Sequence, residues 1–373
     1  MGTVNFKAAA RDGVAELKAY VPGKPLEEVR EEYGLTKVVK LASNECPFPP
    51  PEELMQALLA ESEAIRRYPD GFCRKLGRKL SAVSGIPQES LIFGNGAEEC
   101  IRLVTQAVLN PGENAIQPYP FFDAYETATV LTGAEVRPVP LKDFAIDLEA
   151  MLAAVDEKTK LVWLCSPANP TGPILTRAQL DGFLAELPDN IFVVLDEAYR
   201  EFVSDPDAAR AEEYLGRDDR VIGLRTFSKA YGVAGLRIGY IVAHPELIRL
   251  VAKVKLPFNV NVFAQAVALY HLEHPDFAKR HVAAILAERE RMTEEFESRD
   301  MRVIPSQANF LLVELPVAVD DLYPKLLRRG FIIRPASIWG FDNYMRFSLG
   351  TAGQDDEFLA VLDDLLGTRA RTK

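Results

Sequence analysis

The chain has 373 residues, enough for two or three domains with a large buried core. Hydrophobic residues make up 48% of it and charged residues 26%, an ordinary globular composition. The net charge of −11 argues against nonspecific nucleic-acid binding, and no apolar run is long enough to span a bilayer. The N-terminus lacks a signal-peptide core, the four cysteines form no CxxC pair, and the four histidines complete no metal site. We therefore expect a cytoplasmic protein with reduced thiols and neither a nucleic-acid nor a membrane partner.

The hydrophobic pattern predicts an α/β protein with a mostly parallel sheet. Residues 1–40 resemble an extended arm with a helical stretch over residues 26–33, and another helix begins after Pro51. From residue 74 to 240, helical segments separate apolar strands that show no polar alternation. Such strands are buried on both faces, so we expect helices on both sides of the sheet. The expected helices cover residues 74–84, 97–109, 120–132 and 176–187, and the expected strands lie near residues 91–93, 115–116, 161–164, 192–195 and 221–225.

The C-terminal part predicts a second, smaller domain. Residues 245–300 have a helical pattern, and residues 276–299 are expected to bridge to an α+β unit. That unit is expected to have strands near residues 302–305, 310–315, 331–334 and 344–348, with helices near 319–329 and 354–366. We therefore predict an N-terminal arm over residues 1–40 that packs with the small domain, a large domain over residues 41–275 and a small domain over residues 276–373.

The segment from Thr226 to Gly239, with the sequence TFSKAYGVAGLRIG, is the most informative part of the chain. Ser228 offers a hydroxyl group and Arg237 a permanently charged planar fork, both suited to a phosphate. Lys229 offers an amine beside them, which can hold an aldehyde cofactor such as pyridoxal 5'-phosphate as a Schiff base. For Lys229 alone, a solvated lysine in a surface turn would be the better interpretation, but the serine and arginine at these offsets favour the cofactor.

Five polar motifs each follow an apolar strand directly, and in an open parallel sheet ligands bind at the carboxyl ends of the strands. The motifs are residues 94–99 (GNGAEE), 117–122 (QPYPFF), 166–172 (SPANPTG), 196–199 (DEAY) and the lysine segment. Gly94-Asn95-Gly96 opens a helix whose amides can hold a phosphate. A dinucleotide-binding fold is the alternative, but its third glycine is missing.

Four residues in these motifs suit the ring of such a cofactor. Asp196 would keep the ring nitrogen protonated, although a helix N-cap explains this residue equally well when it is taken alone. Asn169 and Tyr199 can donate to the phenolate oxygen, and Phe122 can stack on the ring. Taken separately, the three are also typical of a turn asparagine, a packed tyrosine and a core aromatic residue.

These residues resemble the class I and II aminotransferases of fold type I, and among them the histidinol-phosphate aminotransferase branch. The resemblance covers nearly the whole chain, and its most specific element is Ser228-Lys229 followed by Arg237. Other similar motifs are Tyr20-x-Pro22-Gly23-Lys24, residues 41–47, Arg67-Tyr68-Pro69-Asp70, residues 257–261, Ala308-Asn309-Phe310, Arg334-Pro335 and residues 346–351. Two departures stand out. Cys46 replaces the second asparagine of the Asn-Glu-Asn-Pro box, and Ala97 lies where serine or threonine is common.

The resemblance implies a role for each site residue. Lys229 would attach pyridoxal 5'-phosphate, Asp196 would pair with the ring nitrogen, and Tyr199 and Asn169 with the ring oxygen. The residues expected around the cofactor phosphate are Gly96, Ala97, Glu98, Ser228 and Arg237, together with Tyr68 from the second subunit of a homodimer with shared active sites. The residues expected to bind the substrate are Tyr20, Asn44, Arg334 and Arg346.

The resemblance and these residues together imply a transaminase in which Lys229 acts as the general base. Arg237 and partial desolvation are expected to lower the pKa of Lys229 for this role. The leading hypothesis is transfer between L-histidinol phosphate and 2-oxoglutarate in histidine biosynthesis. An aromatic amino-acid aminotransferase is the first alternative, because Trp339 and Phe341 lie between the two arginines. A decarboxylase resembling threonine-phosphate decarboxylase is the second. A non-enzymatic cofactor-sensing regulator is the third, but no basic helix-turn-helix precedes residue 40.

Overall fold

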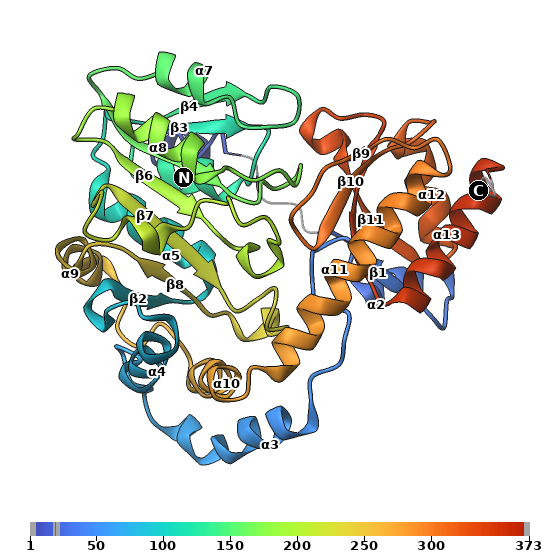
Figure 1. Cartoon of the computed structure of the whole chain (residues 1–373), viewed down its shortest axis with the longest axis horizontal. Coiled ribbons are helices and arrows are strands. Elements are labelled where there is room, and N and C mark those ends of the chain that lie inside the picture. Colours follow the sequence, from blue (N-terminus) through green and yellow to red (C-terminus); the bar gives the residue numbers. More distant parts are fainter. Residues whose placement is uncertain (1–4, 18, 20–22, 369–373) are drawn as a thin grey trace.

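Two β-sheets organise the chain, which the structure, a computed structural model, describes over residues 5–17, 19 and 23–368 (Figure 1). The larger sheet has the strand order β2-β8-β7-β6-β5-β3-β4. Its strands are β2 (Leu91–Gly94), β3 (Asn114–Tyr119), β4 (Glu135–Pro140), β5 (Thr159–Cys165), β6 (Phe192–Asp196), β7 (Val221–Thr226) and β8 (Gly239–Val242). β8 runs antiparallel to β2 and β7, whereas the other neighbours pair in parallel, which confirms the prediction of a mostly parallel sheet.

Helices cover both faces of this sheet because its strands carry apolar side chains on both. Leu161 and Trp163 of β5 pack on one side, and the alternating Val162 and Leu164 pack on the other. The first group shares a core with α5 (Gly96–Val108), α6 (Ala124–Val130) and α9 (Pro245–Val254), and the second with α7 (Leu148–Ala153) and α8 (Arg177–Glu186).

The smaller sheet combines strands from distant parts of the chain, in the order β1-β11-β12-β10-β9. Its strands are β1 (Val39–Leu41), β9 (Val303–Ile304), β10 (Phe310–Glu314), β11 (Phe331–Pro335) and β12 (Tyr344–Ser348). β1 pairs in parallel with β11, with Val39 opposite Phe331. The residues that follow β1 are thereby held beside the C-terminal strands.

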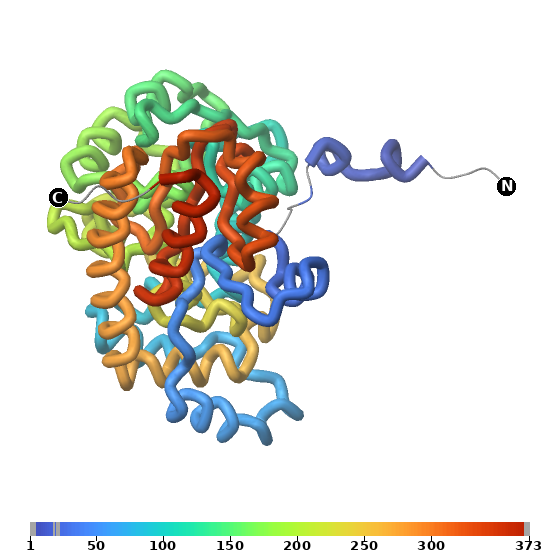
Figure 2. The backbone as a smooth tube through the Cα atoms, turned by 90° about the vertical axis from the view of Figure 1, so that its right-hand side faces the viewer, coloured from blue at the N-terminus to red at the C-terminus, as the bar shows by residue number. Residues whose placement is uncertain are grey.

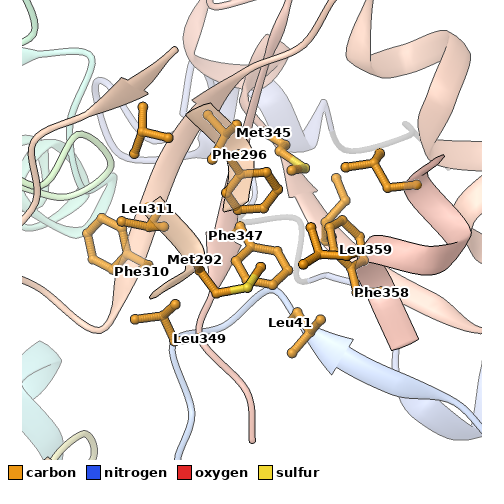
Figure 3. Packing of buried hydrophobic residues seen from close by; sticks show 14 of the residues in the cluster. Leu41, Met292, Phe296, Phe310, Leu311, Met345, Phe347, Leu349, Phe358 and Leu359 are labelled. Carbon is orange, nitrogen blue, oxygen red and sulfur yellow. The ribbon is translucent and has the colours of Figure 1, made fainter. Parts of the chain in front are cut away.

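The helix α11 (Asp276–Glu297) runs from the region of the larger sheet to the smaller sheet (Figure 1). It buries Met292 and Phe296 among side chains of β12 and of α13 (Ala352–Leu366), as Figure 3 shows. The rings of Phe296 and Phe347 meet edge to face, with centroids 5.4 Å apart. Aromatic side chains of this size dominate core energetics, so this contact fixes α11 to the smaller sheet.

Most of the expected elements occur, with shifts of a few residues. Further helices are α1 (Phe6–Ala9), α2 (Leu26–Tyr33), α3 (Glu52–Ala60), α4 (Arg74–Ser84), α10 (Val262–Glu273) and α12 (Val319–Arg328), and Figure 2 shows α1 to one side of both sheets. The helix expected over residues 120–132 is shorter and corresponds to α6, because residues 120–123 form a loop at the end of β3. The strands β1, β4 and β8 and the helices α1 and α7 were not expected. In the described residues no helix is both long and apolar enough to cross a membrane.

Candidate active site

A cavity of about 200 Å³ lies at the carboxyl ends of the parallel strands, and residues of both sheets line it. The expected site residues that line it are Asn44, Ala97, Glu98, Phe122, Asn169, Asp196, Tyr199, Ser228, Lys229, Arg237, Arg334 and Arg346. The structure therefore brings residues from all five strand-end motifs to one place. Asn44, Arg334 and Arg346 come from segments of or beside the smaller sheet, so the cavity lies where the two sheets meet.

Lys229 follows β7, and its Nζ donates a hydrogen bond to the Ser43 carbonyl oxygen at 3.0 Å. Burial, followed by repulsion from Arg346 and then from Arg237, lowers the pKa of Lys229 to about 8, while the Glu45 carboxylate opposes the shift. A sizeable fraction of the amine is therefore neutral near pH 8, the form that attacks a carbonyl or accepts a proton. The sequence assigned the electrostatic effect to Arg237, whereas the structure assigns the larger share to Arg346.

Asp196 ends β6 and is 3% exposed. Its Oδ2 accepts a hydrogen bond from the Tyr125 hydroxyl at 2.6 Å, and its Oδ1 accepts one from the Ala198 amide at 3.0 Å. Burial raises the pKa of Asp196 to about 6, and the two donated hydrogen bonds oppose that rise. The Ala198 contact is a local Asx turn and not a helix N-cap, because Tyr199 occupies the N-cap position of the short helix over Arg200–Phe202. A positive partner in the cavity would stabilise this buried carboxylate.

Tyr199 and Asn44 form a buried hydrogen-bonded pair. Asn44 adopts a positive φ of 54° and donates from Nδ2 to the Tyr199 hydroxyl at 3.0 Å. Its Oδ1 accepts from the Ser348 hydroxyl at 2.7 Å, which fixes the amide orientation. Burial raises the pKa of Tyr199 to about 12, so the phenol stays protonated and can donate to a ligand oxygen.

The start of α5 and the lysine segment together form a cradle suited to an anion. Ala97 and Glu98 lie in the first turn of α5, where main-chain amides have no partner within the helix. Ser228 and Arg237 line the same cavity. Gly96 has a φ of +82°, and a Cβ placed there would lie 2.7 Å from Arg237 Nη2. Glycine at this position therefore makes room for the guanidinium group.

The side chain of Glu98 contributes little to this cradle. It is about half exposed, with Oε1 3.7 Å from Arg102 Nη2 on the next turn of the helix. Only its main-chain amide is placed to meet an anion. Thr226 adds a hydroxyl group that sequence reasoning missed, and it donates to Ser228 Oγ at 2.9 Å.

Arg334 and Arg346 lie directly opposite each other on the antiparallel strands β11 and β12. Arg346 is 7% exposed and donates from Nη1 to Asn169 Oδ1 and from Nη2 to the Ala42 carbonyl oxygen, both at 2.6 Å. Asn169 thus uses its amide oxygen for Arg346, and its amide nitrogen is the group that can donate to a ligand. The Trp339 ring lies 5.9 Å from the Arg334 guanidinium and 5.2 Å from that of Arg346.

Of the expected residues that the structure describes, Tyr68 and Gly96 do not line this cavity. Tyr68 is 82% exposed and stacks on Phe258 with ring centroids 4.6 Å apart. Tyr20 lies outside the described residues. Gly96 adjoins Arg237 and is not a residue of the cavity wall.

The sequence did not indicate several residues of the cavity wall, namely Phe121, Asp123, Tyr125 and Thr226. It also did not indicate that Trp339 contacts both arginines. Tyr125 lies three residues after Phe122, but Phe122 precedes α6, so no helical spacing links the two residues in the sequence.

The residues present fit pyridoxal 5'-phosphate. The anion cradle would receive its phosphate, and the buried Asp196 would meet its ring nitrogen, since a protonated nitrogen supplies the cation that this carboxylate lacks. Lys229 lies in the same cavity, with its pKa lowered enough to act as a nucleophile. Phe122 borders the cavity, where it can pack on a ring.

Comparisons with known proteins agree with this fit. The family described as aminotransferase class I and II matches residues 36–362. A histidinol-phosphate aminotransferase of Moorella thermoacetica is 40% identical over 358 residues, which cover 95% of this chain and 92% of the relative. The structure of a histidinol-phosphate aminotransferase from Sinorhizobium meliloti in complex with pyridoxal-5'-phosphate has a TM-score of 0.85 at 25% identity, covering 93% of this chain and 95% of that one. An L-threonine-O-3-phosphate decarboxylase from Porphyromonas gingivalis has a TM-score of 0.76 at 26% identity, covering 88% of this chain and 100% of that one.

Proposed function

Because the chain belongs to the class I and II aminotransferases, a family that depends on pyridoxal 5'-phosphate, we propose that it moves an amino group between L-histidinol phosphate and 2-oxoglutarate. This reaction belongs to histidine biosynthesis. The observation that carries the choice of donor is the pair of arginines, Arg334 and Arg346, in the same cavity as Lys229. The similarity to a histidinol-phosphate aminotransferase over most of the chain supports it.

The arginine pair favours a doubly charged anion. Residues directly opposite on antiparallel strands have Cβ atoms about 4.5–5.5 Å apart, and like charges at such positions destabilise a sheet. An anion between the two guanidinium groups removes that repulsion and gains charge-assisted hydrogen bonds. A phosphate monoester carries a charge of roughly −1.5 to −2 at neutral pH, so it neutralises the pair better than one carboxylate. A carboxylate of 2-oxoglutarate would use the same pair in the second half of the reaction.

The chain's own residues account for the proton transfers. When bound, pyridoxal phosphate supplies an electron-accepting ring that stabilises the charge left after the substrate α-proton is removed. Lys229 Nζ takes that proton when the amine is neutral, and would deliver it to the cofactor carbon that had carried the aldehyde. Asp196 holds a proton at the ring nitrogen by its negative charge. The protonated Tyr199 and the Asn169 amide donate to the ring oxygen.

We further propose a homodimer with shared active sites, in which Tyr68 reaches the cofactor phosphate of the partner. Large apolar side chains stay exposed on and around α3 and in residues 65–72 and 256–258 of the isolated chain, and such patches mark interfaces. They are Met55, Leu59, Ile65, Tyr68, Phe72, Leu256 and Phe258. We also propose that the chain consists of an arm of residues 1–40, a large domain of residues 41–275 and a small domain of residues 276–373. We propose a cytoplasmic location for the enzyme.

Two other activities remain alternatives that specific observations favour. Trp339 contacts both arginines, so it borders the place where the anionic end of a substrate would lie, and an aromatic amino acid would find an apolar surface there. The structural likeness to an L-threonine-O-3-phosphate decarboxylase raises the second alternative, because a phosphorylated amino acid would use the same arginine pair.

A panel of amino donors with 2-oxoglutarate tests the proposal through the absorbance change of the cofactor. We expect kcat/KM for histidinol phosphate to exceed that for phenylalanine, and glutamate to accumulate. Carbon dioxide release without a need for a 2-oxo acid would instead identify a decarboxylase. Lys229→Ala should abolish turnover while the protein stays folded, and near-normal transamination by this variant would refute the mechanism. Arg346→Ala should raise KM for histidinol phosphate, whereas Arg249→Ala, at an exposed site on α9, should not.

A further inference from the structure

We infer that Tyr125 is a positioning residue of this active site. Its hydroxyl group holds Asp196 in place as a hydrogen-bonded carboxylate, and its ring sets the orientation of Phe122. One side chain thus orients two groups that would contact the cofactor ring, one at the ring nitrogen and one at the ring face. The inference rests on the proposed function for the cofactor, but it does not depend on which amino donor the enzyme uses.

The hydroxyl group of Tyr125 has a single proton to donate, and Asp196 Oδ2 receives it at 2.6 Å. Tyr125 is fully buried and Asp196 is 3% exposed, so bulk solvent competes little with this bond. A distance of this length is typical of a hydroxyl donating to an ionised oxygen. Burial, with Asp196 next, raises the pKa of Tyr125 well above its ordinary value, so the phenol keeps its proton throughout the working range.

Among the described residues, no other titratable side chain donates a hydrogen bond to Asp196. Glu197, the next residue on the chain, raises the pKa of Asp196, and Lys229 lowers it from across the cavity. The neighbouring groups that burial keeps neutral by raising their pKa are the thiols of Cys165 and Cys100 and the phenol of Tyr199. If the Tyr125 hydroxyl were removed, the buried carboxylate would retain one donated hydrogen bond, from the Ala198 amide.

The ring of Tyr125 packs between two other aromatic rings, those of Trp163 and Phe122. It stacks on the buried Trp163, with centroids 4.6 Å apart and planes 10° from parallel. Phe122 meets it edge to face, at 5.7 Å and 88°. Such edge-to-face contacts are favoured by the aromatic quadrupole and hold the second ring at a defined angle. Trp163 therefore fixes Tyr125, which in turn fixes Phe122 at the cavity wall.

Packing alone does not account for a tyrosine here, because phenylalanine would fill the same space. A buried hydroxyl group costs free energy unless it is paired, and this one is paired with the carboxylate of the site. The two contributions can be separated by substitution. Tyr125→Phe removes the hydrogen bond and keeps the ring, whereas Tyr125→Leu removes both. Tyr344→Phe is the matched control, since the Tyr344 hydroxyl also donates to a carboxylate, Glu314 at 2.8 Å, outside the cavity.

The first measurement follows the carboxyl group of Asp196 in cofactor-free, 13C-aspartate-labelled protein, assigned by comparison with Asp196→Asn. Tyr125→Phe should weaken the acidity of Asp196 by about tenfold or more, because hydrogen bonds to charged groups contribute about 1.5–3 kcal/mol. The second measurement uses the loaded enzyme. In Tyr125→Phe, the acid limb of the pH profile of kcat/KM should move to higher pH. Tyr125→Leu should in addition bind pyridoxal phosphate more weakly than Tyr125→Phe does.

An unchanged titration of Asp196 in Tyr125→Phe would overturn the inference, as would an equal shift of the acid limb in Tyr344→Phe. If Tyr125→Leu fails to show a cooperative thermal transition, Tyr125→Phe alone decides the matter. The titration needs no substrate, so it also separates the two proposals. A donor panel in which histidinol phosphate is inactive would end the proposed function, while a shifted titration would still uphold the role of Tyr125.

Discussion

Exchanging Gly96 for alanine tests the anion cradle directly. Gly96 has a φ of +82°, and a Cβ there would lie 2.7 Å from Nη2 and 3.1 Å from Cζ of Arg237. Gly112 offers a matched control, since its φ is +84° and a Cβ there meets no heavy atom within 4 Å. The two substitutions impose the same backbone strain, but only one of them pushes against the guanidinium group that we propose to bind the cofactor phosphate.

The backbone strain should destabilise both variants by about 1–2 kcal/mol. In Gly96→Ala the guanidinium of Arg237 must also move away, which weakens its charge-assisted hydrogen bonds to the phosphate. Such bonds contribute about 1.5–3 kcal/mol, so pyridoxal phosphate should bind roughly 10- to 150-fold more weakly than it binds to Gly112→Ala.

The assay is a titration of each cofactor-free variant with pyridoxal phosphate, followed by absorbance, together with urea unfolding of the same samples. We expect similar losses of unfolding free energy in the two variants and a large difference in cofactor Kd. Equal Kd values for Gly96→Ala and Gly112→Ala would refute the assignment of Arg237 and the start of α5 as the phosphate cradle.

Three further predictions follow from the described contacts. In cofactor-free protein, the rate at which Lys229 binds pyridoxal phosphate should rise with pH, with a midpoint near pH 8. Arg346→Leu should move this midpoint to higher pH, because it removes a positive charge near the amine. Stopped-flow absorbance measures the rate, and an unmoved midpoint would contradict the effect of Arg346 on the pKa of Lys229. Burial and the adjacent Glu288 raise the pKa of Asp355 to about 9, above the value in the unfolded chain. Its contribution to stability is therefore full at low pH and is lost as pH rises from about 4 to about 9, and Asp355→Asn should flatten that dependence in urea unfolding at pH 6 and pH 9. Trp339→Leu should raise KM for a phosphorylated donor about 2- to 5-fold with little change in kcat, because each cation–π contact contributes about 0.5–1 kcal/mol; an unchanged KM would contradict it.

Much of the fold was predictable because the strands of the larger sheet are buried on both faces. Their unbroken apolar runs, such as Leu161 to Leu164, identify a covered parallel sheet, and the polar motifs that follow them then converge by topology. The edge strand β4 escaped prediction for the opposite reason. It is largely exposed and contains Pro138 and Pro140, a composition tolerated at the edge of a sheet.

The residues that the sequence did not reveal depend on contacts between distant segments. Tyr125 looks like an ordinary helix residue until α6 is placed above the end of β6, where its hydroxyl reaches Asp196. The larger effect of Arg346 on the pKa of Lys229 depends on β12 lying beside the large sheet. No local sequence pattern predicts the contact between Tyr125 and Asp196 or the effect of Arg346 on Lys229.

The pairing of β1 with β11 has a consequence for synthesis on the ribosome. The stretch from Ala42 to Asn44 emerges early, yet its place beside the cavity depends on strands that are translated near the end. Arg346, which holds the Ala42 carbonyl oxygen, is added later still. A nascent chain therefore has no complete pocket to present to the vitamin-derived cofactor until residue 348 has left the exit tunnel.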